Sequence, residues 1–131
     1  MPLPMAKQEY LEVSTSVPSD YTVKVINIDA DLFIFIDDSY REIHAEIVGP
    51  ESCVKEICVD EGDRFKRILK LSKNWQEDLF FVRPISTCPL GNIYTRAIVT
   101  FYVPRGTVIN VEKLGGQIIV NDYDGQVVIS K

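Results

Sequence analysis

The stretch TVINVEKLGGQIIVNDYDGQVVI, residues 107–129, repeats an apolar pattern every nine residues. Gly116 and Gly125 begin the second and third copies. The aligned apolar positions are Ile109, Ile118 and Val127, and also Val111, Val120 and Ile129. Short apolar segments separated by glycines at a fixed period predict short stacked β-strands joined by tight turns. The repeat therefore predicts a shape and carries no sign of a reaction.

Nine residues suit two arrangements of such strands. One is an antiparallel meander of short hairpins, which exposes one broad face. The other is half of a two-sided coil, which hides its core between two layers. We therefore predict an all-β fold of stacked short strands, either β-solenoid-like or a β-sandwich or meander. A chain of 131 residues is long enough for one such domain with its own core.

The pattern of strands extends toward the N-terminus. Residues 21–26 and 43–47 alternate between apolar and polar side chains, which predicts strands with one buried face. Residues 32–36, LFIFI, are apolar throughout, and this predicts a strand with both faces covered. Val25, Ile34 and Ile43 are also nine residues apart, so a looser copy of the repeat is predicted in this half of the chain.

The remaining segments complete the predicted organisation. Residues 1–19 form an arm in which Tyr10, Leu11 and Val13 could make an edge strand, and residues 20–131 form the β-repeat domain. Residues 52–73 fit either an amphipathic helix or a pair of strands, and the β-rich surroundings favour the strands. Residues 74–88 read as a long connection, and residues 97–103 as a strand with alternating faces.

Charge argues against a nucleic-acid partner. The formal net charge is −5, whereas neutralising phosphates requires a concentrated basic surface. One basic cluster lies beside the acidic residues at positions 60, 61 and 63, and we interpret it as a solvated charged face. Its members are Arg64, Lys66, Arg67, Lys70 and Lys73.

The N-terminal residues and the cysteines give the expected cellular compartment of the protein. Residues 1–5, MPLPM, contain neither a charged leader nor an apolar run, and no stretch is long enough to span a bilayer. As written, the chain is predicted to be cytoplasmic without membrane insertion, although a segment of an exported or anchored protein would look the same. Cys53, Cys58 and Cys88 make an odd number, which favours reduced thiols and leaves one disulfide plus one free thiol as the alternative.

The order of the motifs resembles a known group. INI at 26–28 and IFI at 34–36 precede a charged middle, VPRG at 103–106 ends a strand, and GQIIV and GQVVI follow. This order is similar to that of the DUF4097 group of uncharacterised β-strand repeat proteins, which carry the label of adhesins. The similarity covers residues 21–131. It implies a β-solenoid-like or stacked-sheet fold and supplies no catalytic residues to carry over.

The candidate catalytic and metal-binding residues do not match the patterns typical of such sites. The single histidine, His44, alternates with Ile43 and Ala45 and is predicted on the face away from the core, without a nucleophile motif beside it. The spacing of the cysteines and His44 does not match the paired ligands of structural zinc sites. Acids that could pair for sugar chemistry stand at turn positions, where acids are expected in any case: Asp29, Asp31, Asp37, Asp38, Asp122 and Asp124. We therefore predict no enzyme, no metal and no cofactor.

The functional expectation is a non-catalytic, adhesin-like domain that acts in protein assembly or surface interaction. The last copy of the repeat has no following copy, so its edge is predicted to pair with another chain or another copy of this chain. The predicted interaction edge consists of Gln126, Val128, Ser130 and Ile119. The alternative is a glycan-binding or small-ligand-binding module that uses Tyr94, Tyr102 and Tyr123, and a small carbohydrate-active enzyme ranks third.

Overall fold

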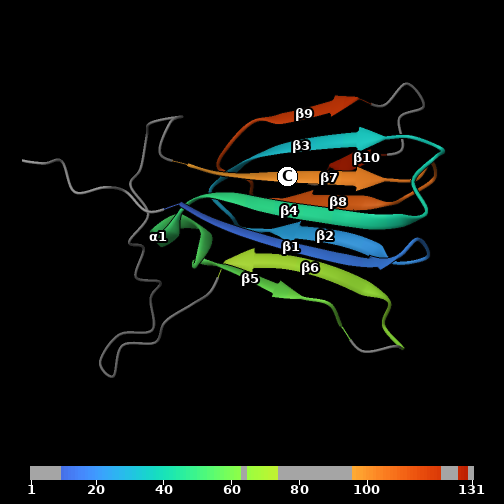
Figure 1. The fold of residues 1–131 in the computed structure, drawn as a ribbon, viewed down its shortest axis with the longest axis horizontal. Coiled ribbons are helices and arrows are strands. Elements are labelled where there is room, and N and C mark those ends of the chain that lie inside the picture. Colours follow the sequence, from blue (N-terminus) through green and yellow to red (C-terminus); the bar gives the residue numbers. More distant parts are fainter. Residues whose placement is uncertain (1–9, 63–64, 74–95, 122–126, 130–131) are drawn as a thin grey trace, which may run out of the picture.

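The computed structural model describes residues 10–62, 65–73, 96–121 and 127–129. They form two five-stranded β-sheets that face one another across a hydrophobic core (Figure 1). Sheet A contains, in spatial order, β1 (Tyr10–Pro18), β4 (Glu42–Pro50), β7 (Ala97–Val103), β3 (Ala30–Ile36) and β9 (Ile118–Asn121). Sheet B contains β10 (Val127–Ile129), β8 (Ile109–Glu112), β2 (Thr22–Ile26), β6 (Ile68–Lys73) and β5 (Ile57–Asp60). The all-β prediction is confirmed.

The nine-residue spacing places successive strands alternately in the two sheets. β8 lies in sheet B, β9 in sheet A, and β10 again in sheet B, where it pairs in parallel with β8. Ile109 of β8 is the partner of Val127 of β10, eighteen residues later. Parallel neighbours need a crossover between them, and here the strand in the opposite sheet provides it. The arrangement of these three strands is therefore that of the two-sided coil, and the antiparallel meander is wrong for them.

The β2–β3 segment is a second copy of the β8–β9 segment. Val25 pairs with Val111 in sheet B, and Ile34 pairs with Val120 in sheet A, so both strand pairs keep the same offset of 86 residues. Ile43 departs from this pattern, because β4 stays in sheet A and runs antiparallel to β7. The nine-residue spacing at Ile43 is therefore not a further half-turn of the same kind.

A close stack of turns joins the two copies at one end of the sheets. The Gly115 N–H donates to Ile28 O at 2.9 Å, and the Leu32 N–H donates to Gln117 O at 2.8 Å. A Cβ atom on Gly116 would lie 2.1 Å from the carbonyl oxygen of Ala30. The turn after β8 thus lies directly against the turn after β2, and the space there admits no side chain at position 116.

Antiparallel strands lie on the β1–β5 side of the two sheets, where residues 52–73 also lie. β1 pairs with β4 along nine residues at the edge of sheet A, and β5 pairs with β6 at the edge of sheet B. The short helix α1 (Glu51–Val54) follows β4 directly, and the Thr15 hydroxyl bonds to Glu61 from across the two edges. The preference for strands over a helix is confirmed by β5 and β6, and Phe65 before β6 is 94% exposed.

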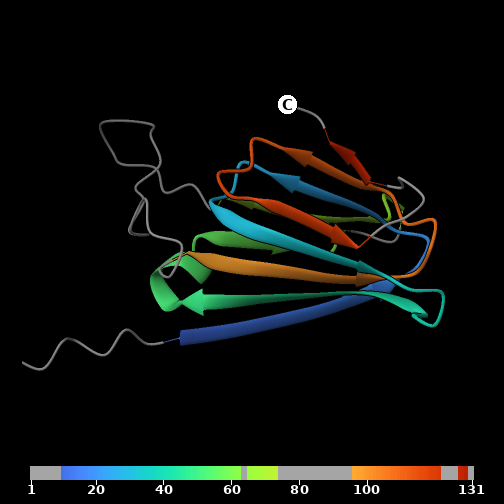
Figure 2. The ribbon, with the colours of Figure 1, turned by 90° about the horizontal axis from the view of Figure 1, so that it is seen from above.

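Figure 2 shows the strands of the two sheets from above. The core side chains fill the space between the inner faces of the sheets. Alternate residues of each strand point inward, as period two requires, and the four inward residues of β7 are fully buried. One prediction about the faces is wrong: β3 is not covered on both sides. Leu32 and Ile34 are buried, whereas Phe35 on the other side is 38% exposed. The apolar run reflects an apolar outer surface, not a second buried layer.

The prediction of reduced thiols is also wrong at one position. Cys53 in α1 is disulfide-bonded, whereas Cys58 on β5 is a free, exposed thiol. An odd number of cysteines accommodates a disulfide and a leftover thiol as readily as it accommodates free thiols, so the count could not decide. Cys88 lies outside the described residues. The disulfide at Cys53 is typical of an oxidising environment.

Candidate interaction surface

The outer face of sheet A carries a group of apolar side chains that we call the aromatic face. It consists of Phe33, Phe35, Ile98, Tyr102 and Ile119. Cross-strand pairing joins four of them, because Ile119 of β9 lies opposite Phe33 of β3 and Phe35 lies opposite Tyr102 of β7; Ile98 of β7 lies opposite Asp31. Ile119 is 50% exposed and Ile98 40% exposed. Grouped exposed apolar side chains of this kind mark interaction sites far more often than scattered ones do.

Tyr102 is the most closely packed member of the aromatic face. Its ring stacks on Phe35 with centroids 5.5 Å apart and planes inclined by 16°. The ring of His44 lies 6.1 Å away on the neighbouring strand β4, and Tyr40 meets Tyr102 edge-on at 5.8 Å. Because Phe35 and His44 stand on opposite sides of it, Tyr102 is held rigidly between its neighbours.

Polar side chains continue the same row toward the edge of the sheet. Ser16 Oγ on β1 lies 2.8 Å from His44 Nδ1, and Glu46 Oε1 on β4 lies 3.2 Å from His44 Nε2. A serine, a histidine and a glutamate in contact have the residue types of a hydrolase catalytic triad. Acyl transfer, however, also needs hydrogen-bond donors for the developing oxyanion, and strand N–H groups point in the plane of the sheet toward neighbouring strands. The row therefore orients His44 and forms a polar border to the aromatic face.

Comparison with solved structures finds three similar proteins. A "putative adhesin" from Parabacteroides distasonis is similar, with a TM-score of 0.50 and 15% sequence identity, and the match covers 88% of this chain and 40% of that one. A second from Parabacteroides merdae has a TM-score of 0.42 and 14% identity, with 84% and 38% coverage. A third from Bacteroides fragilis has a TM-score of 0.44 and 12% identity, with 91% and 53% coverage.

The similarity to the Parabacteroides distasonis structure shows a shared fold. This chain spans about two fifths of the length of that protein. No known family's sequence profile matches the chain. No curated protein matches it in sequence either. The resemblance to the DUF4097 group therefore stays a prediction.

The predicted interaction edge lies partly within the described residues. Ile119 belongs to β9 and Val128 to β10, which are the outermost described strands on the same side of sheets A and B. The two strands are thus the edge strands on one side of the two sheets, and their pairing with another chain stays a prediction. Gln126 and Ser130 lie outside the described residues.

The predicted ligand face is represented by one residue. Tyr102 lies on the outer face of sheet A, as the alternation of 97–103 predicted, and Tyr94 and Tyr123 lie outside the described residues. The other members of the aromatic face on β3 and β7 were not predicted as part of a ligand face: Phe33, Phe35 and Ile98. The all-apolar run at 32–36 contains Phe33 and Phe35, but such a run also fits a strand buried on both faces, which is what the sequence predicted.

The candidate acid pairs stand at opposite ends of β3. Asp31 Oδ1 accepts from the Gln117 N–H at 3.0 Å, and Asp29 Oδ2 lies 3.8 Å from Lys73 Nζ. At the other end, Asp37 and Asp38 belong to the turn after β3. The ends of a seven-residue strand are about 20 Å apart. An acid at one end of β3 is therefore too far from an acid at the other end for the two to act as the carboxylate pair of a glycosidase. Asp122 and Asp124 lie outside the described residues.

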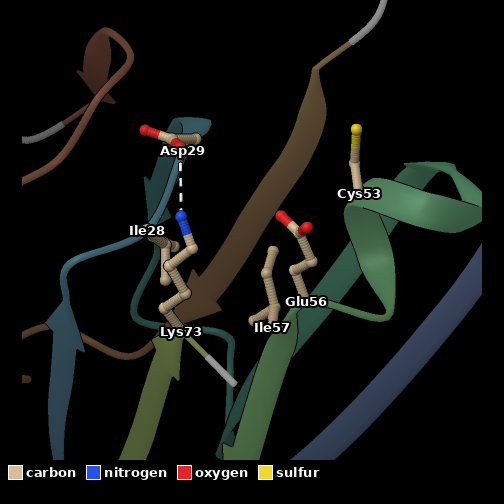
Figure 3. Close-up of a pocket in the computed structure, with 6 residues that line it drawn as sticks. All are labelled: Ile28, Asp29, Cys53, Glu56, Ile57 and Lys73. Carbon is tan, nitrogen blue, oxygen red and sulfur yellow. Dashed lines mark ion pairs between the residues drawn. The ribbon is translucent and has the colours of Figure 1, made fainter. Parts of the chain in front are cut away.

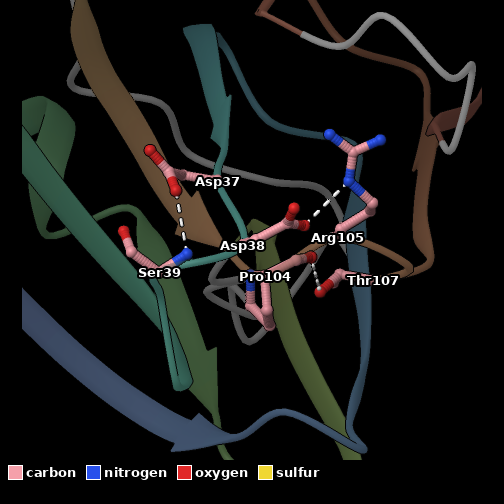
Figure 4. Close-up of polar contacts among 6 residues, drawn as sticks. All are labelled: Asp37, Asp38, Ser39, Pro104, Arg105 and Thr107. Atoms are coloured by element: carbon pink, nitrogen blue, oxygen red, sulfur yellow. Dashed lines mark hydrogen bonds and ion pairs between the residues drawn. The ribbon is translucent and has the colours of Figure 1, made fainter.

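The turn after β3 shows how its acids are used (Figure 4). The Ser39 N–H donates to Asp37 Oδ1 at 2.8 Å, and this hydrogen bond is the largest cause that lowers the pKa of Asp37. The Ser39 hydroxyl and the Arg105 charge lower the pKa further. Arg105 Nε donates to Asp38 Oδ1 at 2.8 Å, which ties this turn to the one after β7. Asp37 and Asp38 therefore hold turns together, which agrees with their turn positions in the sequence.

The candidate metal ligands are spread over different elements. His44 lies on the outer face of sheet A, Cys58 on β5 of sheet B, and Cys53 is disulfide-bonded. In the described part of the chain, no three histidine, cysteine or acidic residues are grouped closely enough to hold a metal ion. The same part contains no helix with the length and hydrophobicity needed to cross a bilayer.

Among the described residues, two hollows lie outside the aromatic face. The first is lined by Ile28, Asp29, Cys53, Glu56, Ile57 and Lys73, and its volume of about 10 Å³ suits at most a single water molecule (Figure 3). The second is a pocket of about 250 Å³ on the outer face of sheet B. It is lined by Lys24, Ile26, Asp60, Gly62, Lys66, Ile68 and Lys70.

The basic cluster is divided by the fold. Arg67 pairs with Asp20 at 2.9 Å and Lys73 with Asp29 at 3.8 Å, so both serve as structural ion pairs. Lys66 and Lys70 line the larger pocket, together with Lys24 from β2. Arg64 lies outside the described residues. The solvated-face interpretation thus describes only part of the cluster.

Proposed function

We propose that this protein is a non-catalytic, adhesin-like module that acts in assembly or surface interaction through the aromatic face of sheet A. The observation that carries the proposal is the continuous apolar strip from Ile119 on β9, across Phe33 and Phe35 on β3, to Tyr102 on β7. Apolar side chains rimmed by polar ones are typical of protein–protein interfaces.

A partner protein is the occupant that this face favours. The aromatic rings are rigid because they stack on one another, so few rotamers are lost on binding. Ser16, His44 and Glu46 supply hydrogen-bonding groups at the border of the strip. An interface of this kind combines an apolar centre with a polar rim. The partner proposed first is a second copy of this chain, with Ile119 on the outermost described strand of sheet A at the contact.

Sedimentation analysis of the purified protein tests the proposal. We expect the wild type to self-associate with rising concentration and an Ile98→Lys, Ile119→Lys variant to remain monomeric, because two charges then lie within the apolar strip. Val108→Lys is the matched control, since Val108 is 42% exposed but lies outside sheet A. Adding Val128→Lys probes the adjoining strand β10. A wild type that is strictly monomeric at high concentration contradicts self-association.

Glycan binding is the alternative, and the partial exposure of Phe35 (38%) favours it. Sugars stack on the faces of aromatic rings, however, and both faces of Tyr102 lie toward Phe35 and His44. A glycan array compares the wild type with Phe35→Ala. Hits that disappear in the variant would replace the protein-partner proposal, and an array without hits would leave glycan binding without support.

A further inference from the structure

We propose that the pocket on the outer face of sheet B binds a small hydroxylated oxyanion, such as a sugar acid or a sugar phosphate. The pocket lies on the opposite layer from the aromatic face and does not depend on the function proposed above. Its volume of about 250 Å³ is slightly below the usual range for small-molecule sites, which suits a ligand of about the size of one sugar.

The arrangement of lysines carries the inference. Lys24 of β2 and Lys70 of β6 are direct partners in the parallel pair, and both line the pocket. Neither takes part in an ion pair with any carboxylate among the described residues. Like charges directly opposite in a sheet are destabilising. An oxyanion held between the two ammonium groups removes that repulsion and gains two charge-assisted hydrogen bonds.

The other walls define the rest of the ligand. Ile26 and Ile68, half-buried neighbours of the two lysines along their strands, supply apolar contact for a carbon ring. Asp60 lies opposite Lys70 on β5 and offers a carboxylate acceptor for hydroxyl groups. The same carboxylate repels a second negative charge at that end. The combination selects a ligand with one anionic end and a hydroxylated body.

The wall formed by Asp60, Glu61 and Gly62 is fixed in place before any ligand arrives. The Gly62 N–H donates to Asp60 Oδ1 at 2.8 Å. Gly62 has a φ of +71°, and a Cβ atom there would lie 2.7 Å from Ile68 O. Glu61 accepts a hydrogen bond from the Thr15 hydroxyl on β1, which ties the segment to sheet A. A preformed wall spares the ligand the entropy cost of ordering it.

Titration of the full chain tests the inference at low ionic strength. The probes are glucuronate, glucose 6-phosphate, inorganic phosphate and glucose, followed by NMR chemical shifts and calorimetry. We expect saturable binding of glucuronate or glucose 6-phosphate with a dissociation constant of roughly 1 mM or below, with shifts at Lys24, Gly62 and Lys70. The first two probes distinguish a carboxylate ligand from a phosphate ligand. Glucose is expected not to bind.

A matched pair of double variants locates the site. Lys24→Gln with Lys70→Gln is expected to weaken binding at least tenfold. Arg41→Gln with Lys113→Gln removes the same charge from exposed positions outside the pocket and should leave binding unchanged. Equal weakening by both pairs, or no saturable binding of either sugar anion, overturns the inference. Inorganic phosphate that binds as tightly as glucose 6-phosphate overturns the assignment of a hydroxylated ligand.

Thermal stability gives a second measurement that does not depend on the affinity of the probe. Lys24→Gln alone should raise the melting temperature of the unliganded protein at low salt, because it removes the repulsion with Lys70 and leaves Asp60 opposite Lys70. The rise should disappear at high salt, where the repulsion is screened. A melting temperature that is lowered or unchanged at low salt contradicts the unpaired lysine contact on which the inference rests.

Discussion

The geometry of the turns that join the strands requires particular residue types at individual positions. Gly116 is glycine because the turn after β8 stacks on the turn after β2, and the backbone of Ala30 occupies the place of a side chain. Asp37 is acidic because its carboxylate accepts the free N–H of Ser39 two residues later. Both residues were visible in the sequence as turn formers, but only the stacking explains why position 116 allows no alternative.

Replacing Gly116 with alanine should destabilise the protein by about 3 kcal/mol, at the upper end for overpacking, because the obstructing atom belongs to the backbone. Chemical denaturation measures the change. Gln117→Ala, an exposed neighbour in the same turn, should change the free energy of unfolding by less than about 0.5 kcal/mol. Equal stability of the Gly116 variant and the wild type would show that the two turns do not stack.

The lowered pKa of Asp37 predicts a dependence of stability on pH. The ordinary value is 3.8, and the folded protein holds the pKa of Asp37 below it. The ionised carboxylate therefore stabilises the fold fully above the ordinary value, and this contribution is lost as the pH falls through the lower, folded value. Asp37→Asn keeps an oxygen that can accept from Ser39. Its denaturation midpoint should fall less than that of the wild type between about pH 5 and pH 2.

At the scale of the strands, alternation and spacing act together. Period two sends Ile118 and Val120 of β9 toward the core and Ile119 outward, while the nine-residue spacing carries the chain from sheet B to sheet A. The alternation of β4, β7 and β9 could be predicted because side-chain direction is a local property of an extended chain. The exposure of one face of β3 could not, because an all-apolar run fits both a buried strand and a strand that presents an interaction surface.

Inserting one residue between Lys113 and Leu114 should displace β9 from sheet A. A shift of one position would turn Ile119 and Asn121 toward the core and expose Ile118 and Val120. Hydrogen exchange should then show loss of protection at residues 118–121, with protection retained in β2 and β6. A two-residue insertion at the same place preserves the alternation and is the control. Equal protection after both insertions would contradict the register of β9 on β3.

At the scale of the whole molecule, the two sheets depend on one shared core. Phe101, fully buried on β7, is among the largest side chains in it. Strands far apart in the chain meet there: β3 and β7 pair in parallel, and β2 lies between β6 and β8 in the opposite sheet. Neither sheet can bury its apolar face without the other, so the two layers should unfold together.

Phe101→Ala should lower the free energy of unfolding by about 3–5 kcal/mol, because it removes a large buried ring and leaves a cavity. Phe65→Ala is the matched control: Phe65 is 94% exposed and should change stability by less than about 0.5 kcal/mol. Denaturation followed by circular dichroism and by fluorescence checks whether the transition of each variant remains single. Comparable losses in both variants would be inconsistent with the placement of Phe101 in the core.

The sequence by itself determined the strand content and the inward and outward faces of most strands, and in 52–73 it only favoured strands over a helix. These follow from local alternation and from turn residues, which act within a few positions of the chain. Only the tertiary structure decided that β8 and β10 pair in parallel, that β2–β3 stacks on β8–β9, and that the outer face of β3 is exposed. It alone also brought Lys24 beside Lys70, 46 positions apart. Such pairings depend on contacts between distant segments, whose free energy is set by packing and charge across the two sheets.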